Sequence, residues 1–256
     1  FIKDFVLSYL EDDAASIRKI AATTSCKLLI SDSMNQSSKS SSKFITVRGH
    51  SGVIVGSVLR KLLMVGIADT NPDIRLAVLN TLHETFDNYL SLADNLKSLF
   101  IALNDEVFEI REVAIKVIGR LSTKNPAYVL PSLRKTLLQL LTELEYSDEA
   151  KGKKESAIML GHLINAAPRL IKPYVSAVLL VLLTQVNHTN PTIVANVLST
   201  IGQLCIVGGT KMCKYIPQLL PLVIDTLKDI PLASTNPKRE VAVRTLGQLI
   251  ASTGFV

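Results

Sequence analysis

The chain is dominated by apolar stretches in which hydrophobic residues recur every three or four positions, the spacing of one face of an α-helix. Short polar turns divide these stretches into pairs, and three turns place Asn-Pro directly before the second member of a pair. Asparagine is a good helix cap, and proline is tolerated in the first helical turn. No convincing set of segments alternates with the period of two that strands show, so the pattern predicts an all-helical chain of helix pairs. The three turns contain Asn71-Pro72, Asn190-Pro191 and Asn236-Pro237.

Four of the predicted second helices share a glycine that is followed two residues later by leucine. The glycines are Gly119, Gly161, Gly202 and Gly247, at intervals of 42, 41 and 45 residues. Self-similarity at about 40 to 47 residues is typical of HEAT or armadillo repeats, whose helix pairs stack into a solenoid. Because a glycine inside a helix costs up to about 1 kcal/mol of helix propensity, its recurrence predicts the close approach of another backbone, most simply the paired helix.

Alignment on this glycine position predicts one all-α domain over residues 1–256, an α–α superhelix of about six helix pairs. The repeats are expected at about 1–30, 53–87, 88–124, 125–167, 168–208 and 209–254. In the first two repeats Cys26 and His83 take the place of the glycine, and both are placed on second helices. The first helices are expected at Ile2–Leu10, Val53–Ala68, Tyr89–Leu103, Ala127–Leu144, Lys172–Val186 and Lys211–Leu227, with bends or late starts at Pro131, Pro217 and Pro221.

One segment interrupts the period. Residues 31–52 begin with a serine-rich run from Ser31 to Lys43 that has almost no apolar content. Such a run cannot offset the entropy of ordering by burial, so it predicts a disordered insertion between repeats. Phosphorylation of its serines is one role for the segment, and a tolerated insertion is the simpler interpretation.

A basic residue lies eight positions before the glycine position in five of the six repeats. An aspartate comes six residues earlier still in the first three repeats, at Asp12, Asp69 and Asp105, and Asp148 comes five residues before its lysine. Similarity to HEAT proteins suggests that such acidic and basic residues link adjacent repeats as a hydrogen-bonded ladder. The alternative is that the acids only cap or flank the second helix, where the helix dipole favours them. The basic residues are Arg18, Arg75, Arg111, Lys153 and Arg239, and the last two repeats carry His188 and Ala233 at the acidic position.

Composition agrees with helix packing: 48% of residues are hydrophobic, 5% are aromatic and none is Trp. The net charge of +6 is mild and scattered, which favours an ordinary solvated surface over a nucleic-acid interface. Cys26, Cys205 and Cys213 form no CxxC pair and fit a reducing compartment. The longest apolar run, Val175 to Val186, is too short for a bilayer and predicts a buried helix. The chain lacks an initiator Met and begins inside an amphipathic pattern, so we expect a fragment of a longer protein.

The sequence offers little chemistry for catalysis. Its histidines are far apart, no pair has metal-ligand spacing, and Gly208-Gly209 resembles a helix stop rather than a phosphate-binding loop. We therefore expect no catalytic, cofactor-binding or metal-binding residue in this chain. Function on a solenoid usually means partner binding along its extended surface. The histidines are His50, His83, His162 and His188.

Several segments between the packing positions carry a more specific resemblance. They closely resemble the helical region of the target-of-rapamycin (TOR) serine/threonine kinases, and they include surface and loop residues that solenoid packing does not require. The likeness covers most of residues 53–256; it is weaker over 1–52, and the serine-rich insertion departs from the pattern. The matching segments are Asp73–Leu79, Ala93–Arg111, Asn125–Lys135, Leu140–Glu145, Ala167–Tyr174 and Thr245–Val256.

The resemblance implies a piece of the N-terminal HEAT solenoid of a kinase that couples nutrient status to cell growth. In that family the solenoid supports dimerisation and binds the raptor-type substrate-recruiting subunit, as in TOR complex 1 (TORC1). It implies a cytoplasmic protein, with peripheral association with lysosomal, vacuolar or other endomembranes as an extension. ATP and Mg²⁺ are expected only in the kinase domain, whose motifs this chain lacks. We expect protein partners, a raptor-type subunit and a second TOR protomer, with no nucleic acid and no direct membrane insertion.

Two other hypotheses remain open from the sequence. The chain resembles in architecture a stand-alone HEAT adaptor, such as a nuclear transport receptor or a phosphatase scaffold. An enzyme acting through this chain alone is the third hypothesis, and the absence of a catalytic constellation in the sequence argues against it.

Overall fold

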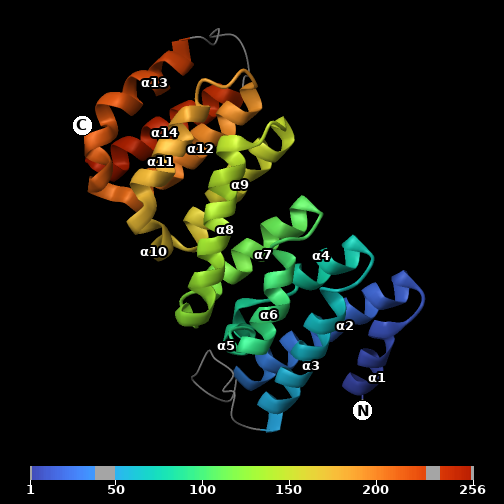
Figure 1. The fold of residues 1–256 in the computed structure, drawn as a ribbon. Helices are drawn as coiled ribbons and strands as arrows, with labels where there is room; N and C mark the ends of the chain where they lie inside the picture. Colours follow the sequence, from blue (N-terminus) through green and yellow to red (C-terminus); the bar gives the residue numbers. More distant parts are fainter. Residues whose placement is uncertain (1, 38–49, 229–236, 255–256) are drawn as a thin grey trace. The chain divides into compact units, whose positions relative to one another are not determined.

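The computed structural model describes residues 2–37, 50–228 and 237–254, and within them it is all-helical (Figure 1). The chain divides into two compact units, residues 1–132 and residues 133–256. The helices of the first part are α1 (Ile2–Ser8), η1 (Tyr9–Glu11), α2 (Ala15–Ser37), α3 (His50–Gly66), α4 (Pro72–Asn80), η2 (Glu84–Phe86), α5 (Asp87–Leu90), α6 (Ala93–Ala102) and α7 (Phe108–Leu121). They are followed by α8 (Pro126–Tyr146), α9 (Ala150–Ala166), α10 (Pro168–Ile171), η3 (Lys172–Tyr174), α11 (Val175–Gln185), α12 (Pro191–Gly208), η4 (Gly209–Tyr215), α13 (Ile216–Lys228) and α14 (Pro237–Thr253).

Each unit is built from two layers of helices. In the first unit the second helices form a row, in which α2 packs against α4 and α4 against α7, while α3 and α6 pack on α4 and α7 from the first-helix layer. In the second unit α9, α12 and α14 form the corresponding row, and α11 and α13 pack on α12 and α14. Each helix pair therefore buries its apolar face against its sequence neighbours, which is the packing of an α-α solenoid.

The core consists of aliphatic side chains from both layers. Leu62, Ile110, Leu160 and Ile193 have no exposed surface. Full burial of such a side chain contributes roughly 1.5–3 kcal/mol. The apolar positions predicted from the helical spacing thus point into the interface between layers.

Two of the three Asn-Pro turns cap second helices as predicted. Asn71 Oδ1 accepts a hydrogen bond from Asp73 N at 2.9 Å before α4, and Asn190 Oδ1 accepts from Thr192 N at 2.9 Å before α12. In both helices the proline occupies the first turn, where its missing N–H leaves no helical bond unmade. Asn236 lies outside the described residues.

The predicted placement of His83 on a second helix is wrong. Helix α4 ends at Asn80, where Thr81 Oγ1 donates to Val78 O at 2.6 Å and satisfies a terminal carbonyl. His83 instead caps η2, because its Nδ1 accepts a hydrogen bond from Thr85 N at 3.3 Å. The second helix of this repeat is too short for the register predicted from its neighbours.

The disordered insertion predicted for residues 31–52 is wrong at both of its ends. Helix α2 continues through residues 31–37, and α3 already begins at His50. Once a helix is nucleated, each further residue adds a backbone hydrogen bond, and Ser or Asn costs only about 0.5 kcal/mol of propensity. Residues 38–49 lie outside the described part of the chain.

Three predicted first helices are interrupted. The one expected at Tyr89–Leu103 divides into α5 and α6, and Asn95 Nδ2 donates to Tyr89 O at 2.8 Å across the break. The ones expected at Lys172–Val186 and Lys211–Leu227 begin as 3₁₀ turns, and their α-helices start only at Val175 and Ile216. Pro217 marks the late start of α13, as predicted. Pro131 and Pro221 lie inside α8 and α13, and the bends expected there stay a prediction.

By length and composition the stretch Pro191–Lys228 is apolar enough to cross a membrane. It is not one straight helix, since α12 ends at Gly208, Gly209 has a φ of 54°, and η4 follows. Half of its most apolar window is buried inside the protein. Apolar side chains such as Ile193 and Leu204 therefore belong to the core of the second unit, whereas Ile206 is exposed.

Candidate interaction surface

An arginine of one repeat reaches the aspartate of the next in the first unit. Arg18 donates two hydrogen bonds to Asp69, from Nε to Oδ2 at 2.7 Å and from Nη2 to Oδ1 at 3.0 Å. Arg75 donates to Asp105 in the same way, from Nε to Oδ2 at 2.8 Å and from Nη2 to Oδ1 at 2.9 Å. The remaining Nη1 group of Arg75 donates back to Asp69 O at 2.9 Å, so the two rungs are connected. This two-point geometry matches the planar guanidinium to the carboxylate.

The same aspartates also hold the turns that precede the second helices. Asp69 Oδ1 accepts from Asn71 N at 2.8 Å, and Asp105 Oδ1 accepts from Val107 N at 2.9 Å. The two interpretations left open by the sequence are therefore both correct, since one carboxylate serves the local turn and the ladder together.

These carboxylates are poorly exposed, with 3% of the Asp69 side chain and 9% of the Asp105 side chain accessible. The hydrogen bond from Arg18 holds the pKa of Asp69 below its usual value against the opposing effect of burial. Burial raises the pKa of Asp105, but the hydrogen bond and charge of Arg75 outweigh it and leave that pKa lowered as well. Both aspartates are thus ionised partners at neutral pH rather than acids or bases available to a substrate.

The later basic residues of the series donate to other kinds of acceptor than Arg18 and Arg75 do. Arg111 Nη1 donates to Asp105 O at 2.7 Å, and its guanidinium lies over the ring of Phe108 at 5.6 Å. Lys153 Nζ donates to Gln185 Oε1 at 3.2 Å, a neutral acceptor. Among the residues described, Asp148 takes part in no ion pair, so of the two interpretations only a position flanking the second helix applies to it. The exposed position of Asp148, in the turn between α8 and α9, explains why it is solvated instead.

The last two repeats keep only parts of the pattern. His188 replaces the aspartate, and its Nδ1 accepts from Asn190 N at 3.0 Å, the bond that Asp69 makes in the first unit. Arg239 lies on α14 and is partly exposed. Ala233 lies outside the described residues.

Two of the four glycines, Gly161 and Gly202, face the neighbouring second helix rather than the paired first helix, which corrects the prediction there. Gly161 on α9 lies against Thr200 and Gln203 of α12, and a methyl group on it would sit 3.3 Å from Thr200 Oγ1. Gly202 on α12 lies against Thr245 and Gln248 of α14. At these two positions the close approach is therefore between neighbouring second helices.

Threonine hydroxyls form hydrogen bonds across this contact between second helices. Thr200 Oγ1 donates to Ala157 O at 2.9 Å, and Thr245 Oγ1 donates to Leu198 O at 2.9 Å, each across to the preceding second helix. Gly119 is buried on α7. Gly247 differs, because nothing lies within 4 Å of the position that a side chain would take.

A third ion pair between arginine and a buried aspartate was not predicted from the sequence. Arg120 donates from Nε and Nη2 to Asp87 Oδ1 at 3.0 Å and 2.8 Å, and Nη2 also reaches Leu82 O at 3.1 Å. Burial raises the pKa of Asp87 more than Arg120 lowers it. Asp87 is the first residue of the four-residue helix α5, where no repeat spacing applies, so no sequence signal pointed to this pair.

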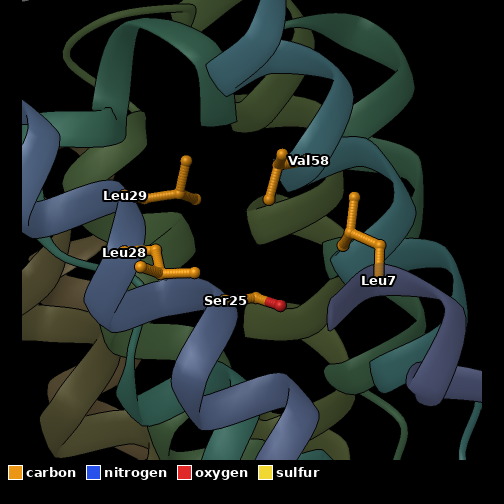
Figure 2. A pocket seen from close by; sticks show the side chains of 5 residues that line it. All are labelled: Leu7, Ser25, Leu28, Leu29 and Val58. Carbon is orange, nitrogen blue, oxygen red and sulfur yellow. The ribbon is translucent and has the colours of Figure 1, made fainter. Parts of the chain in front are cut away.

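The hollows of the two units do not resemble a reaction site. Figure 2 shows a small apolar hollow between α1, α2 and α3, lined by Leu7, Ser25, Leu28, Leu29 and Val58, which leaves no room for a water molecule. In the second unit a groove of about 630 Å³ lies between α13 and the start of α12. Its ionisable side chains are His188, Asp225 and Lys238, which do not form a group of three metal ligands in the described residues.

The two buried thiols, Cys26 and Cys205, are equally unsuited to nucleophilic chemistry. Burial raises the pKa of Cys26 to about 11, although its hydrogen bond to Thr81 lowers it in part, and burial raises the pKa of Cys205 to about 12. A thiol attacks only as a thiolate, and neither group ionises at neutral pH. The ion pairs and buried thiols described here hold the fold together. Contacts with other molecules would therefore be made by the exposed surface.

Comparison with known proteins places this surface in context. No protein-family model matches the chain. It is 44% identical over 256 residues to serine/threonine-protein kinase TOR2 of Saccharomyces cerevisiae and 42% identical over 263 residues to TOR of Arabidopsis thaliana, covering all of the chain and 10% of each relative. It is 45% identical over 206 residues to mTor of Drosophila melanogaster, 79% of the chain. The chain thus spans about a tenth of the length of the curated relatives it matches.

Solved structures with the same fold include the karyopherin Kap121p. Kap121p bound to Nup53p aligns with a TM-score of 0.55 over 98% of this chain and 29% of its own, at 14% identity. Kap121p bound to Pho4p gives a TM-score of 0.54, covering 98% of this chain and 30% of its own, also at 14% identity. Such a likeness concerns the fold alone, and it confirms the predicted all-α, HEAT-like superhelix.

Proposed function

We propose that this chain, which belongs to the target-of-rapamycin family of serine/threonine kinases as one helical-repeat segment, is a scaffold on which such a kinase assembles with protein partners. The observation that carries the proposal is the identity of 41–44% over the full chain to TOR kinases of two yeasts and a plant. The fold supports it, because a solenoid offers extended surface while its ladders and glycine contacts keep the repeats in register.

The proposed partners are a raptor-type subunit and a second TOR protomer, in the complex that adjusts growth to nutrients. Exposed large apolar side chains are available for contact on the first-helix layer, among them Met64 and Ile101 in the first unit and Leu180 in the second. The test is co-purification of a tagged 256-residue chain with an untagged raptor-type subunit, and analytical ultracentrifugation of the chain alone for self-association. A chain that is folded by circular dichroism but retains neither partner contradicts the proposal.

Catalysis is proposed to reside outside this segment, with ATP and Mg²⁺ bound by the kinase domain of the longer protein. The paired aspartates and buried thiols described above support this view, since each is already committed to a structural partner or held neutral. Incubation of the purified chain with ATP and Mg²⁺ tests it. We expect no turnover above a heat-denatured control, and turnover that scales with folded chain would reject it.

The proposed location is the cytoplasm, with peripheral association with lysosomal or vacuolar membranes through the assembled complex. Fractionation of cells that express the tagged chain tests this. Recovery from membranes that resists high salt would point to direct insertion and contradict the proposal.

The alternative function is a stand-alone HEAT adaptor, such as a nuclear transport receptor or a phosphatase scaffold. The fold likeness to Kap121p favours it, but that likeness comes with 14% identity, against 44% to TOR2. Binding of the chain to a Nup53p segment, with no binding to a raptor-type subunit, would favour the transport receptor.

A further inference from the structure

Charge is distributed unevenly in the second unit. Residues 133–256 hold 13 of the 28 basic residues but only 8 of the 22 acidic ones, and no Asp or Glu occurs between Glu155 and Asp225. Of the eight acidic residues, five lie between the end of α8 and the first half of α9, Asp225 and Glu240 lie on α13 and α14, and Asp229 lies outside the described residues. They are Glu143, Glu145, Asp148, Glu149, Glu155, Asp225, Asp229 and Glu240.

The elements between these two acidic regions, α10, η3, α11, α12 and η4, contain no Asp or Glu. Six exposed cations come from α8 and from the turns α10–η3 and η4, with which the first helices of the next two repeats begin. In the part of the chain that the structure describes, none of the six forms an ion pair. We call this set the cationic edge; it consists of Arg134, Lys135, Arg169, Lys172, Lys211 and Lys214.

Contacts between the three segments show that they are neighbours. The guanidinium of Arg134 on α8 lies over the ring of Tyr174 in η3, 5.6 Å from its centre. The start of α11 lies against the end of α12, since a methyl group on Gly208 would sit 3.2 Å from Val175 Cγ1, and η4 begins at the next residue. Lys214 Nζ lies 4.8 Å from the centre of the Tyr215 ring in η4. The cations therefore follow one another across three successive repeats, and two of them are held in place by aromatic rings.

Nothing described on the elements packed against this edge neutralises it. Helix α14 reaches η4 through Cys213 Sγ and Thr253 O at 3.8 Å, and its only acid, Glu240, lies near its other end. The carboxyl ends of α9 and α12 supply partial negative charge, worth about 0.3–1 kcal/mol per nearby cation when exposed. That effect does not account for six exposed cations, four of which lie in the stretch without acidic residues between Glu155 and Asp225.

We propose that the cationic edge binds an acidic segment of a protein partner. The inference rests on the proposed function, that the chain binds proteins, and names the chemistry of one such contact. Three repeats, each about 10 Å across, present charge over roughly 20 Å, the length of an extended segment of about six residues. Fixing Arg134 and Lys214 over tyrosine rings lowers the entropy lost when an acid binds them.

A protein segment fits better than a lipid surface. Peripheral membrane binding combines cations with exposed apolar side chains that enter the lipid. Here the large apolar residues of the same turns are covered: Leu170 is 7% exposed, and Ile171 and Met212 are fully buried. The other exposed residues of these turns are Pro168, Pro173, Thr210 and Cys213, none of which is a large apolar side chain that would enter lipid.

The test measures binding of a fluorescein-labelled twelve-residue peptide of alternating Glu and Ser to the full 256-residue chain by fluorescence anisotropy at low salt. The edge variant is Arg169→Gln/Lys172→Gln/Lys211→Gln. The matched control, Lys19→Gln/Lys27→Gln/Arg60→Gln, removes three exposed cations from the first unit and leaves the same net charge. Both variants are compared with the parent chain by circular dichroism, so that loss of folding is recognised.

We expect the edge variant to weaken peptide binding about tenfold, the effect of losing three exposed ion contacts, and the control to leave it nearly unchanged. Equal loss in both variants would mean attraction by net charge and would overturn the proposal, as would undetectable peptide binding. Binding of phosphatidylserine vesicles that the edge variant loses, without peptide binding, would overturn it in favour of a membrane. If the chain and the edge variant bind a raptor-type subunit equally well, the scaffold proposal stands and the edge is rejected as its contact.

Discussion

The contact between α12 and α14 makes a prediction about two glycines that have the same sequence context. Gly202 and Gly247 each occupy the third position of a Thr-x-Gly-Gln segment, in the middle of a second helix. A methyl group on Gly202 would meet the end of Gln248 and lie 3.3 Å from the backbone Cα of Thr245, whereas one on Gly247 would meet nothing within 4 Å. The same substitution to alanine should therefore have opposite effects at the two positions.

The magnitude follows from two terms. Replacing a mid-helix glycine with alanine stabilises a helix by about 1 kcal/mol, and this gain applies to both positions. At position 202 it is offset by overpacking of about 1–3 kcal/mol, because the side chain of Gln248 can swing away but the Cα of Thr245 cannot move without shifting α14. Gly247→Ala should stabilise the chain by up to about 1 kcal/mol, and Gly202→Ala should be less stable than Gly247→Ala by about 1–3 kcal/mol.

Urea unfolding followed by circular dichroism measures the difference, with the parent chain as reference. Because solenoid units can unfold separately, amide hydrogen exchange in α12 and α14 locates the effect. Gly202→Leu, with a larger side chain, should cost more than Gly202→Ala. If the two alanine variants are stabilised equally, α12 and α14 do not approach closely at Gly202, and the proposed reason for the repeated glycine is wrong.

Three further predictions concern the ion pairs and the thiols. Arg75→Met should destabilise the first unit by about 3 kcal/mol in urea unfolding, because it leaves the poorly exposed Asp105 carboxylate unpaired. The double variant Arg75→Met/Asp105→Asn should recover part of that loss. No recovery would contradict a paired role for the two side chains. The lowered pKa of Asp69 contributes stability that is present above pH 3.8, the ordinary aspartate pKa, and is lost as the pH falls through the lower pKa of the folded state. The free energy of unfolding, measured from neutral to acidic pH, should therefore fall less steeply in Asp69→Asn. An unchanged slope would refute the assignment. Iodoacetamide should modify the exposed Cys213 first, while Cys26 and Cys205 are protected until unfolding, as followed by mass spectrometry; early labelling of Cys205 would show that the core opens locally.

Much of the fold could be predicted because its signals are local. Apolar spacing located the helix pairs, and Asn71 and Asn190 cap second helices as their Asn-Pro turns indicated. The failures lie where local signals compete. Thr81 and His83 end α4 early through their own side-chain bonds, and α2 continues into a serine-rich stretch because helix propagation costs little there.

The candidate surface was harder to predict. The sequence proposed a ladder and a capping role for the aspartates as alternatives, and one carboxylate, Asp69, performs both. The pairing of Asp87 with Arg120 had no spacing rule, because Asp87 lies in an irregular stretch. The cationic edge was also invisible as such, since its six residues are scattered over about eighty positions and only stacking brings them into one row.

The sequence by itself determined that this chain is a helical solenoid and whose solenoid it resembles. Periodicity, caps and repeat length act within a few turns of the chain, and the residues between the packing positions carried the likeness to TOR kinases. Only the tertiary structure decided which groups meet, such as Arg18 with Asp69 over 51 residues and Thr245 with Leu198 over 47. Those partners depend on how far each helix extends and how closely the next one stacks. Spacing along the chain does not specify either distance, because both are set by side-chain packing between repeats.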